Sequence, residues 1–220
     1  MALEGSGVMV MLSLSLHTLN ERRGITPGSP PHRVRQAVFH RANSMLYRPG
    51  DRTGTLYDIA FGTVRTYHMM SDGRRQISGF YFAGDVFGLE PQPRHRLFAE
   101  TVEECAIRPF DQRTEVAGAE ALYALAQADL GRLGDHLMLL GHANALARIS
   151  RFMLDLDSRQ GRDGLVTLGM PRADIADFLG LTIETVSRVF TRLSEMRLIA
   201  RDTARSIELL DRDGLAALCD

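Results

Sequence analysis

Short apolar runs alternate with turn signals over residues 38 to about 110. The apolar runs lie at residues 56–59, 64–69 and 76–82, and the turn signals beside them are Arg48-Pro49-Gly50-Asp51, Phe61-Gly62, Ser71-Asp72-Gly73 and Ala83-Gly84-Asp85. Strands that recur about every ten residues are typical of an antiparallel sandwich or jelly roll. The Ser-Asp-Gly triplet is expected at the tip of a hairpin.

The pattern changes to a helical period between residue 120 and about residue 159. Four leucines form a heptad-like stripe, at Leu130, Leu133, Leu137 and Leu140. The stripe extends backward to Ala126 and forward to Asn144 and Ala147. We expect this helix to pair with its copy, so that the four leucines are dimerisation residues; packing of the helix on its own domain is the alternative.

A break in this helical stretch is expected at Gly141-His142, because glycine weakens a helix interior. A second amphipathic run follows, with apolar residues at Ile149, Phe152, Met153 and Leu156. Residues 160–164 then predict a turn, and residues 165–168 a short strand.

The most specific pattern lies at residues 171–193. Pro171 favours a helix start, since it lacks the N–H that would have no partner there. Gly180 favours the end of that helix, because glycine readily adopts the left-handed conformation of a C-cap. Thr182 is a typical N-cap for a second helix. Two helices joined in this way predict a helix-turn-helix.

Two helices that cross closely need a small residue at the crossing point. Ala176 lies four residues before Gly180, and Val186 lies six residues after it, where it would fill the core under the second helix. We therefore expect Ala176, Gly180 and Val186 to be structural residues of the helix-turn-helix, with Leu181 buried in the turn.

The outward face of the second helix carries side chains suited to DNA. Base reading is predicted for Glu184, Ser187 and Arg188: the arginine can donate two hydrogen bonds to guanine, the glutamate can accept from cytosine and orient the arginine, and the serine can reach a base edge or a phosphate. DNA-backbone or supporting roles are predicted for Thr182, Thr185, Thr191, Arg192 and Arg172. An ordinary surface ion pair is the alternative, and the helix-turn-helix spacing argues against it. Residues 198–201 and 206–209 would add a two-stranded wing.

Composition narrows the function without identifying it. The chain has 220 residues, 45% of them hydrophobic, and a formal net charge of −1, so any nucleic-acid-binding surface must be local. All 26 basic residues are arginine. Cys105 and Cys219 are too few for a disulfide framework or a protein-only zinc or iron–sulfur site. We therefore expect no metal, and a reducing, cytoplasmic setting.

Residues 1–35 are expected to form an N-terminal arm. Residues 7–19 are apolar, but they follow Glu4 rather than a basic residue and no small-residue cleavage site comes after them, so we expect neither a signal peptide nor a membrane partner. The apolar stretch is too short to span a bilayer. Prolines and glycines between residues 21 and 37 then interrupt regular structure.

These patterns predict an α+β protein in four parts: an arm at 1–35, a jelly-roll domain at 36–118, a dimerisation helix at 119–146 and a winged helix-turn-helix at 147–220. This order, with Glu-Thr-Val-Ser-Arg at 184–188, resembles the Crp/Fnr regulators over about residues 36–212. The resemblance implies a cyclic-nucleotide-binding-type β-roll and a homodimer that binds double-stranded DNA at TTGA-type half-sites in an inverted repeat.

Residues 71–77, 84–90, 95–100 and 174–188 further resemble the FixK-like subgroup. That resemblance implies an activator of genes for low-oxygen respiration and nitrogen metabolism. Such an activator would have RNA polymerase as a partner.

The resemblance also limits the possible effectors. The cAMP-binding pattern is Gly-Glu-Leu followed by Arg-Ser, whereas this chain has Gly88-Leu89-Glu90 and Arg96-Leu97, so we do not expect cAMP. An Fnr-type iron–sulfur cluster needs N-terminal cysteines, and residues 1–104 contain none. Cys105 is expected to be a buried small hydrophobic residue.

Haem stays possible in principle, but no histidine stands in a diagnostic pattern; the candidates are His40, His68, His95, His136 and His142. His95-Arg96 could bind an anion, although a structural salt bridge is the expected role. We predict a protein without a cofactor that is active without a ligand. A ligand-gated sensor, whose β-roll binds an unidentified small molecule or haem, is the alternative.

An enzyme is not expected, because no nucleophile–base set, phosphate loop or metal cluster stands at a usable spacing. Glu103 and Glu104 are adjacent, so on a strand their carboxylates would face opposite sides.

Overall fold

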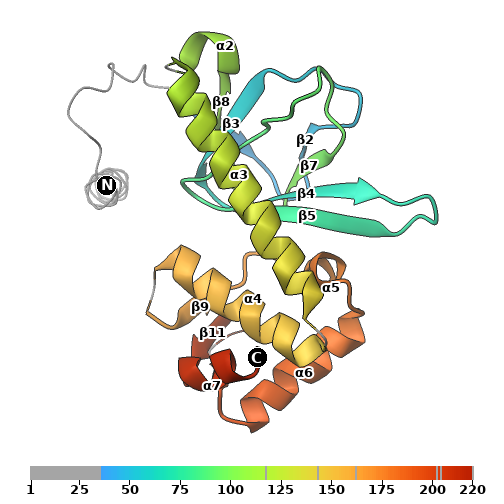
Figure 1. Ribbon diagram of the computed structural model, residues 1–220, viewed down its shortest axis with the longest axis vertical. Helices are drawn as coiled ribbons and strands as arrows, with labels where there is room; N and C mark the ends of the chain where they lie inside the picture. Colours follow the sequence, from blue (N-terminus) through green and yellow to red (C-terminus); the bar gives the residue numbers. More distant parts are fainter. Residues whose placement is uncertain are drawn as a thin grey trace, which may run out of the picture. The chain divides into compact units, whose positions relative to one another are not determined.

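The computed structural model describes residues 36–116, 118–142, 144–161, 163–201, 203 and 205–219. The predicted arm at residues 1–35 lies outside this range. Within it, strands β1–β8 come first in the chain, followed by helices α2–α4 and then by a mixed segment from β9 to α7 (Figure 1).

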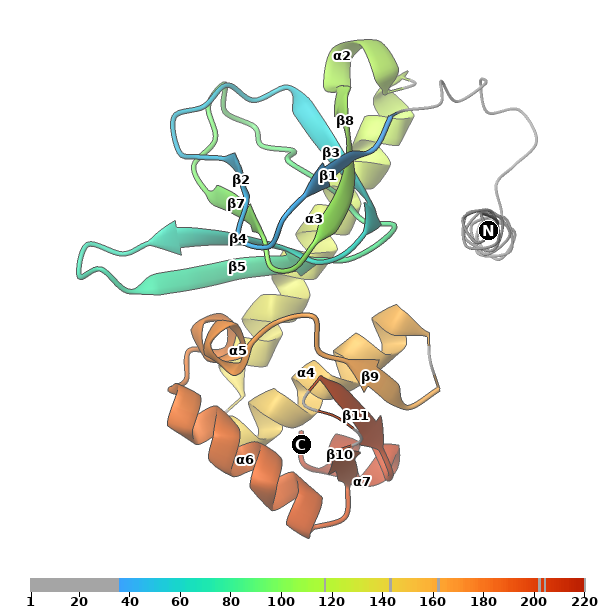
Figure 2. The same ribbon diagram turned by 180° about the vertical axis from the view of Figure 1, so that it is seen from behind.

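Two antiparallel four-stranded sheets form the N-terminal domain, with strand orders β1-β8-β3-β6 and β2-β7-β4-β5 (Figure 2). The strands are β1 Val38–His40, β2 Met45–Tyr47, β3 Thr55–Phe61, β4 Val64–Met69, β5 Arg75–Tyr81, β6 Val86–Phe87, β7 Phe98–Thr101 and β8 Cys105–Asp111. The predicted antiparallel jelly roll is confirmed. The β4–β5 hairpin turns at Ser71-Asp72-Gly73, as expected, and the Gly73 N–H donates to Met70 O at 3.0 Å.

The interior of the β-roll is packed around buried side chains from both sheets: Tyr47, Ile59, Val64, Phe87, Ala99, Cys105 and Ile107. Gly62 makes the turn from β3 to β4 with φ 93°. A Cβ at Gly62 would lie 2.5 Å from Cys105 Sγ, so no larger residue fits there. The prediction that Cys105 is a buried apolar residue is confirmed, because its exposed fraction is 0%.

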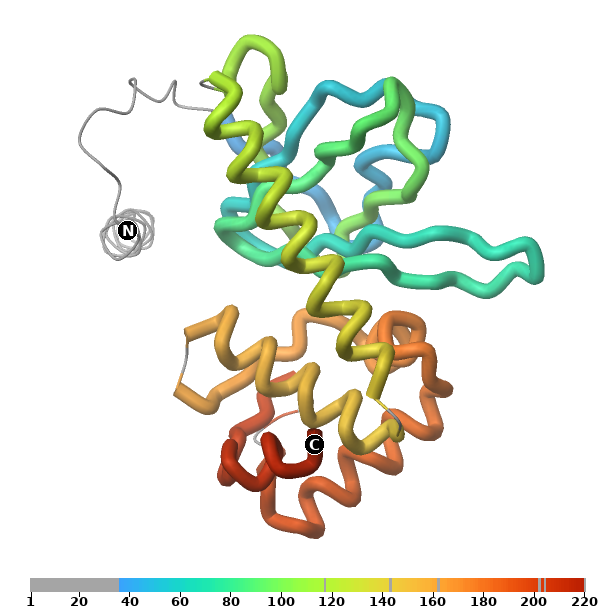
Figure 3. Tube along the Cα trace, viewed as in Figure 1, coloured from blue at the N-terminus to red at the C-terminus, as the bar shows by residue number. Residues whose placement is uncertain are grey.

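Helices α2 Gln112–Glu115, α3 Gly118–Gly141 and α4 Ala145–Gln160 follow the β-roll. The predicted forward extension of the leucine stripe to Asn144 and Ala147 is wrong. Helix α3 ends at Gly141, and α4 begins at Ala145 in a new direction (Figure 3). The Asn144 side chain caps α4 by accepting from the Ala147 N–H at 2.8 Å. Ala147 is buried in the C-terminal core, because the break between the helices gives α4 a direction of its own.

The C-terminal domain contains β9 Leu165–Thr167, α5 Arg172–Leu179, α6 Ile183–Glu195, β10 Ile199–Arg201, β11 Ser206–Leu209 and α7 Arg212–Ala217. The predicted wing strands pair as β10 and β11, and β9 joins β11 on its other side. The sequence reasoning did not anticipate α7. Asp211 caps this helix by accepting from the Gly214 N–H at 2.8 Å, and Leu215 anchors it with an exposed fraction of 0%.

One buried hydrophobic cluster fills the C-terminal domain and also includes Tyr67, Ile77 and Phe80 of strands β4 and β5. The C-terminal domain and the β-roll therefore share part of their apolar core. This shared packing sets where the helix-turn-helix lies on the rest of the described chain.

Candidate nucleic-acid interface

The turn between α5 and α6 joins the two helices through three residues. Gly180 has φ 64° and ψ 39°, and its N–H donates to Ala176 O. The half-buried Leu181 donates its N–H to the same carbonyl at 3.0 Å. Thr182 then caps α6 by accepting from the Thr185 N–H at 3.2 Å. A left-handed glycine followed by a hydroxyl cap ends one helix and starts the next within three residues.

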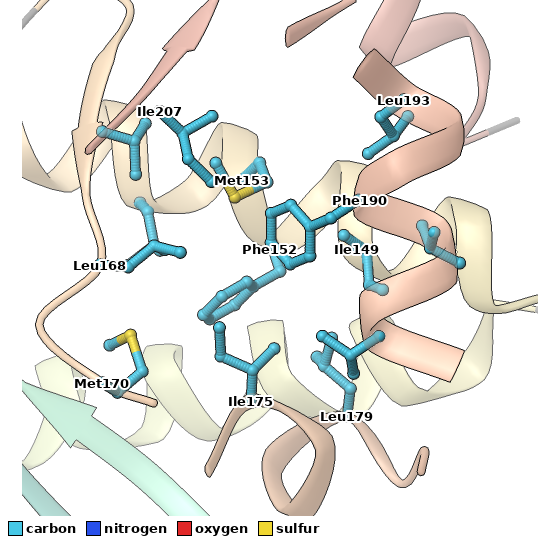
Figure 4. Packing of buried hydrophobic residues seen from close by; sticks show 14 of the residues in the cluster. Ile149, Phe152, Met153, Leu168, Met170, Ile175, Leu179, Phe190, Leu193 and Ile207 are labelled. Carbon is cyan, nitrogen blue, oxygen red and sulfur yellow. The ribbon is translucent and has the colours of Figure 1, made fainter. Parts of the chain in front are cut away.

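The inner faces of α5 and α6 are apolar. Ala176 is 3% exposed and Val186 is 0% exposed, so a small and a branched residue occupy the positions where the sequence placed them. Figure 4 shows the apolar side chains that α5 and α6 direct against α4. The labelled residues of these three helices are Ile175, Leu179, Phe190, Leu193, Ile149, Phe152 and Met153. This core holds α6 with its opposite face directed outward.

The outward face of α6 is polar and open. Glu184, Arg188, Thr191 and Arg192 are exposed, and Ser187 is half-buried. A shallow hollow on this face is lined by Ser187, Arg188, Thr191, Arg192 and Glu195. Because residues three and four apart share a helix face, the structure brings the three predicted base readers together with Thr191 and Arg192. Such a face has the size and chemistry to enter a DNA major groove.

Glu184 is ionised at the start of α6. Hydrogen bonds from its own backbone N–H and from the Thr182 hydroxyl, with the nearby Arg188 charge, lower the pKa of Glu184. A negative charge in the first turn also complements the helix dipole. The Arg188 guanidinium is only loosely held, since its Nη2 is 3.5 Å from Thr185 Oγ1. Arg188 is therefore free to turn toward a base.

Arg172 lies apart from this outward face. Its Cζ is 4.3 Å from the ring centroid of Phe190, which is a cation–π contact beneath α6. Burial, followed by the positive charge of Arg201, lowers the pKa of Arg172. Of the two kinds of role predicted for Arg172, this position favours support of α6 over contact with DNA.

Three exposed arginines of the segment after α6 were missed by sequence reasoning: Arg197, Arg201 and Arg205. The Arg205 side chain is 72% exposed and lies 3.8 Å from a Glu103 oxygen of the β-roll. The wing strands were predicted, but their side chains were not considered. The density of arginine between residues 197 and 205 was the available signal.

The β6–β7 loop is closed by an internal carboxylate. Glu90 accepts from the Arg96 N–H at 2.9 Å, and its other oxygen lies 2.8 Å from His95 Nδ1. The His95 ring also stacks on Tyr47 with centroids 3.7 Å apart. The structural role expected for His95 is confirmed by this buried pairing.

Other chemistry finds little support among the residues that the structure describes. No group of three or more His, Cys, Asp or Glu side chains there could hold a metal ion. Burial raises the pKa of Cys105 to about 11, so this thiol stays protonated and unreactive at neutral pH. No helix in the described ranges is long and apolar enough to cross a membrane.

Known proteins match both halves of the chain. The Crp-like helix-turn-helix domain matches residues 147–218, and the cyclic nucleotide-binding domain matches residues 37–111. The chain is 40% identical over 200 residues to the nitrogen fixation regulation protein FixK of Rhizobium meliloti. This alignment covers 91% of this chain and 93% of that protein. It is 33% identical over 198 residues to the transcriptional activatory protein AadR of Rhodopseudomonas palustris, with coverage of 84% and 83%.

Among solved structures, FixK2 from Bradyrhizobium japonicum aligns with a TM-score of 0.80 at 36% identity. The alignment covers 86% of this chain and 98% of that one.

Proposed function

This chain belongs to the Crp/Fnr family and is a DNA-binding transcription regulator, and from this premise we propose that it is a homodimeric activator that reads TTGA-type half-sites in an inverted repeat. Glu184, Ser187 and Arg188 would read the bases. The observation that carries this proposal is the outward face of α6, where Ser187 and Arg188 line a shallow hollow and Glu184 is exposed one turn before them. Arg188 supplies the two donors that guanine recognition requires.

Contacts to the DNA backbone would flank the base readers. Thr191 and Arg192 lie on the same face of α6, and Arg201 and Arg205 are exposed on the wing side. Phosphate contacts from such residues fix the orientation of a protein on the duplex without reading its sequence. Thr182 and Thr185 would act by holding the first turn of α6.

Pairing of two chains would use the leucine stripe of α3. Leu130, Leu133 and Leu137 are 70%, 51% and 62% exposed, whereas His136 and Leu139 on another side of the helix are buried. Large exposed leucines in a row mark an interaction surface. Leu140 is partly buried beside Gly180, so it would form the end of the stripe.

The regulated genes would concern low-oxygen respiration and nitrogen metabolism. The nitrogen part of the proposal rests on the 40% identity to FixK, a nitrogen fixation regulation protein, and the activator role rests on the likeness to AadR. The low-oxygen part rests on the resemblance of the sequence to the FixK-like subgroup. An activator that recruits RNA polymerase to a promoter would contact the polymerase directly. The site of action would be the cytoplasm, where a bacterial promoter is found.

We also propose that DNA binding needs no cofactor. Glu90 is engaged by His95 and the Arg96 N–H inside the protein, so its carboxylate is not available to a cyclic nucleotide. The internal contact gives this loop a fixed conformation without a ligand. This argues against gating by a cyclic nucleotide.

A footprint with purified protein and no added ligand tests the proposal. Protection of two TTGA-type half-sites, with about one helical turn between their centres, is expected. Arg188→Ala should weaken each half-site by about 1–3 kcal/mol and relax the guanine preference. Arg192→Ala is the matched control, because loss of a phosphate contact should weaken all sequences alike. Equal affinity of the wild type for all sequences would overturn the proposal.

A further inference from the structure

A buried carboxylate joins the first helix of the helix-turn-helix to the β-roll. Asp174 lies in the first turn of α5 and is 1% exposed. Its Oδ2 is 2.5 Å from Arg65 Nη1 on β4, and its Oδ1 is 2.5 Å from Arg75 Nη2 on β5. One carboxylate of the DNA-binding domain thus pairs with two guanidinium groups of the other domain.

The start of α5 leaves this carboxylate available. Asp174 stands at the third helical position, from which an acidic side chain can reach back to the N–H of the N-cap residue. The N-cap here is Pro171, which has no N–H, and α5 has no side-chain cap. The Asp174 side chain therefore serves the contact between domains instead of capping its own helix.

Arg65 is held from several sides. Its Nη2 is 2.7 Å from Glu100 Oε2 and 3.1 Å from Asn43 Oδ1, and its Nε is 3.2 Å from the same Glu100 oxygen. The side chain is 8% exposed. The Arg65 guanidinium is planar, and Glu100 and Asn43 accept from its Nε and Nη2. These contacts fix the orientation of the group, so that its Nη1 points toward Asp174.

Arg75 forms the outer arm of the same contact. Its Nε is 2.9 Å from Asp177 Oδ2, one turn further along α5. Gln76 next to it donates its side-chain amide to Asp177 O at 2.8 Å. The β-roll therefore binds α5 at two successive points, which prevents rotation of the helix about a single contact.

Movement of α5 on the β-roll would leave buried charges unpaired, and an unpaired buried charge is strongly unfavourable. The turn at Gly180 connects α5 rigidly to α6, and on its other side α5 is tied to α3 because the Phe178 ring stacks on His136 with centroids 3.9 Å apart. Helix α6 is consequently fixed in direction relative to α3.

We propose that Arg65 and Asp174 are positioning residues for DNA recognition, which hold α6 at one orientation to α3 so that a dimer accepts half-sites at one spacing. The inference rests on the proposed function, because spacing matters only when two copies read an inverted repeat. Inserting one base pair moves a half-site by about 3.4 Å and turns it by about 34°, which a rigid dimer cannot follow. A dimer whose DNA-binding domains are loosened can still bind the displaced half-site. It also loses the gain in affinity that a preset geometry gives at the preferred spacing.

The test compares full-length wild type, Asp174→Asn and Asp213→Asn. The two variants each remove one negative charge from the DNA-binding domain, but Asp213 is exposed on α7. Each protein is titrated against a single half-site, against the preferred inverted repeat, and against repeats lengthened or shortened by one and two base pairs. We expect equal affinity of both variants for the single half-site. The preference of Asp174→Asn for one spacing should fall at least about tenfold below that of Asp213→Asn.

A melting curve shows whether Asp174→Asn is folded; if it is not, Arg75→Gln decides, because it removes only the outer, more exposed arm. The inference is overturned if the folded variant keeps the spacing preference of Asp213→Asn, or if it loses affinity for every probe by the same factor. Wild-type protein that prefers no inverted repeat over a single half-site would instead contradict the proposed function.

Discussion

The imidazole of His136 on α3 lies flat against the ring of Phe178 on α5, with centroids 3.9 Å apart and planes within 6° of each other. Its Nε2 is 2.8 Å from Phe178 O, so the ring donates to that carbonyl as well. Burial lowers the pKa of His136, although hydrogen bonds to the backbone at Phe178 and Ser78 oppose the effect. A neutral imidazole therefore joins the long helix to the DNA-binding domain.

This contact should weaken in mild acid. The pKa of His136 is lower in the folded chain than the usual histidine value of 6.5, so the unfolded chain takes up its proton first as the pH falls. The contribution to stability is therefore complete above about pH 6.5 and is lost as the pH falls through the folded value. We expect the melting temperature of wild type to drop on acidification below about pH 6.5.

His136→Gln should show a flatter dependence over the same range, because Gln cannot take up the proton. Asp129 and Asp155 line one cavity together with His136, and burial raises the pKa values of both carboxyl groups. Both residues are present in wild type and variant, so their effects cancel in the comparison. Replacement of the exposed His68 by Gln is the control. Identical pH curves for wild type and His136→Gln would refute this account.

Gly180→Ala should destabilise the DNA-binding domain. The φ of 64° lies in the left-handed region, which costs an ordinary L-residue about 1–2 kcal/mol. A Cβ would meet only Arg148 Nη1 at 3.7 Å and Leu140 Cδ2 at 3.9 Å, so the cost comes from the backbone and not from a clash. Gly180→Asn should retain more stability, since asparagine tolerates this conformation. Denaturant unfolding of both variants measures the difference.

Charges placed in the leucine stripe should separate the dimer. The double substitution Leu133→Glu and Leu137→Glu puts like charges where two copies would meet, and light scattering should then report a monomer. Ala124→Glu is the control, because Ala124 is exposed on α3 but does not belong to the stripe. A double variant with the mass of the wild type would show that the leucines do not form the interface.

Gly169→Ala should disturb the contact between the β-roll and the segment before α5. A Cβ at Gly169 would lie 2.4 Å from Thr63 Oγ1 and 3.0 Å from Glu103 Oε1. Thr63 is buried and donates to Glu103 at 2.8 Å, so it cannot move aside freely. Overpacking of this kind costs about 1–3 kcal/mol in unfolding free energy.

Adding Thr63→Ala to Gly169→Ala removes the nearest atom and should restore part of the loss. A double-mutant cycle measures this coupling between the two domains. Additive effects of the two substitutions would mean that the predicted clash is absent.

The helix-turn-helix could be predicted because its determinants are local. Gly180 ends one helix through its own backbone conformation. Thr182 starts the next helix through a hydrogen bond to Thr185, only three residues further along the chain. Ala176 and Val186 are buried, as their spacing from Gly180 predicts. The strands of the β-roll could be predicted for a similar reason, since turn-forming residues separate short apolar runs.

The limit of local reasoning shows at the end of α3. The spacing of the leucine stripe continues to Asn144 and Ala147 in the sequence. Periodicity alone does not show at which residue the helix ends. The Asn144 cap and the burial of Ala147 were decided by how α4 packs in the C-terminal core. Helix α7 was missed because one buried leucine gives too little periodic signal.

Sequence alone predicts the order of the parts, the helix-turn-helix and the side chains on the outward face of α6, because each depends on residues a few positions apart. How that face is held depends on contacts that form only in the folded chain. Arg65 and Asp174 are 109 residues apart, and nothing beside either one indicates the other. In the sequence, Arg65 resembles any charged residue of a strand with alternating polarity. The fold buries its side chain, and a buried charge requires a partner of opposite charge.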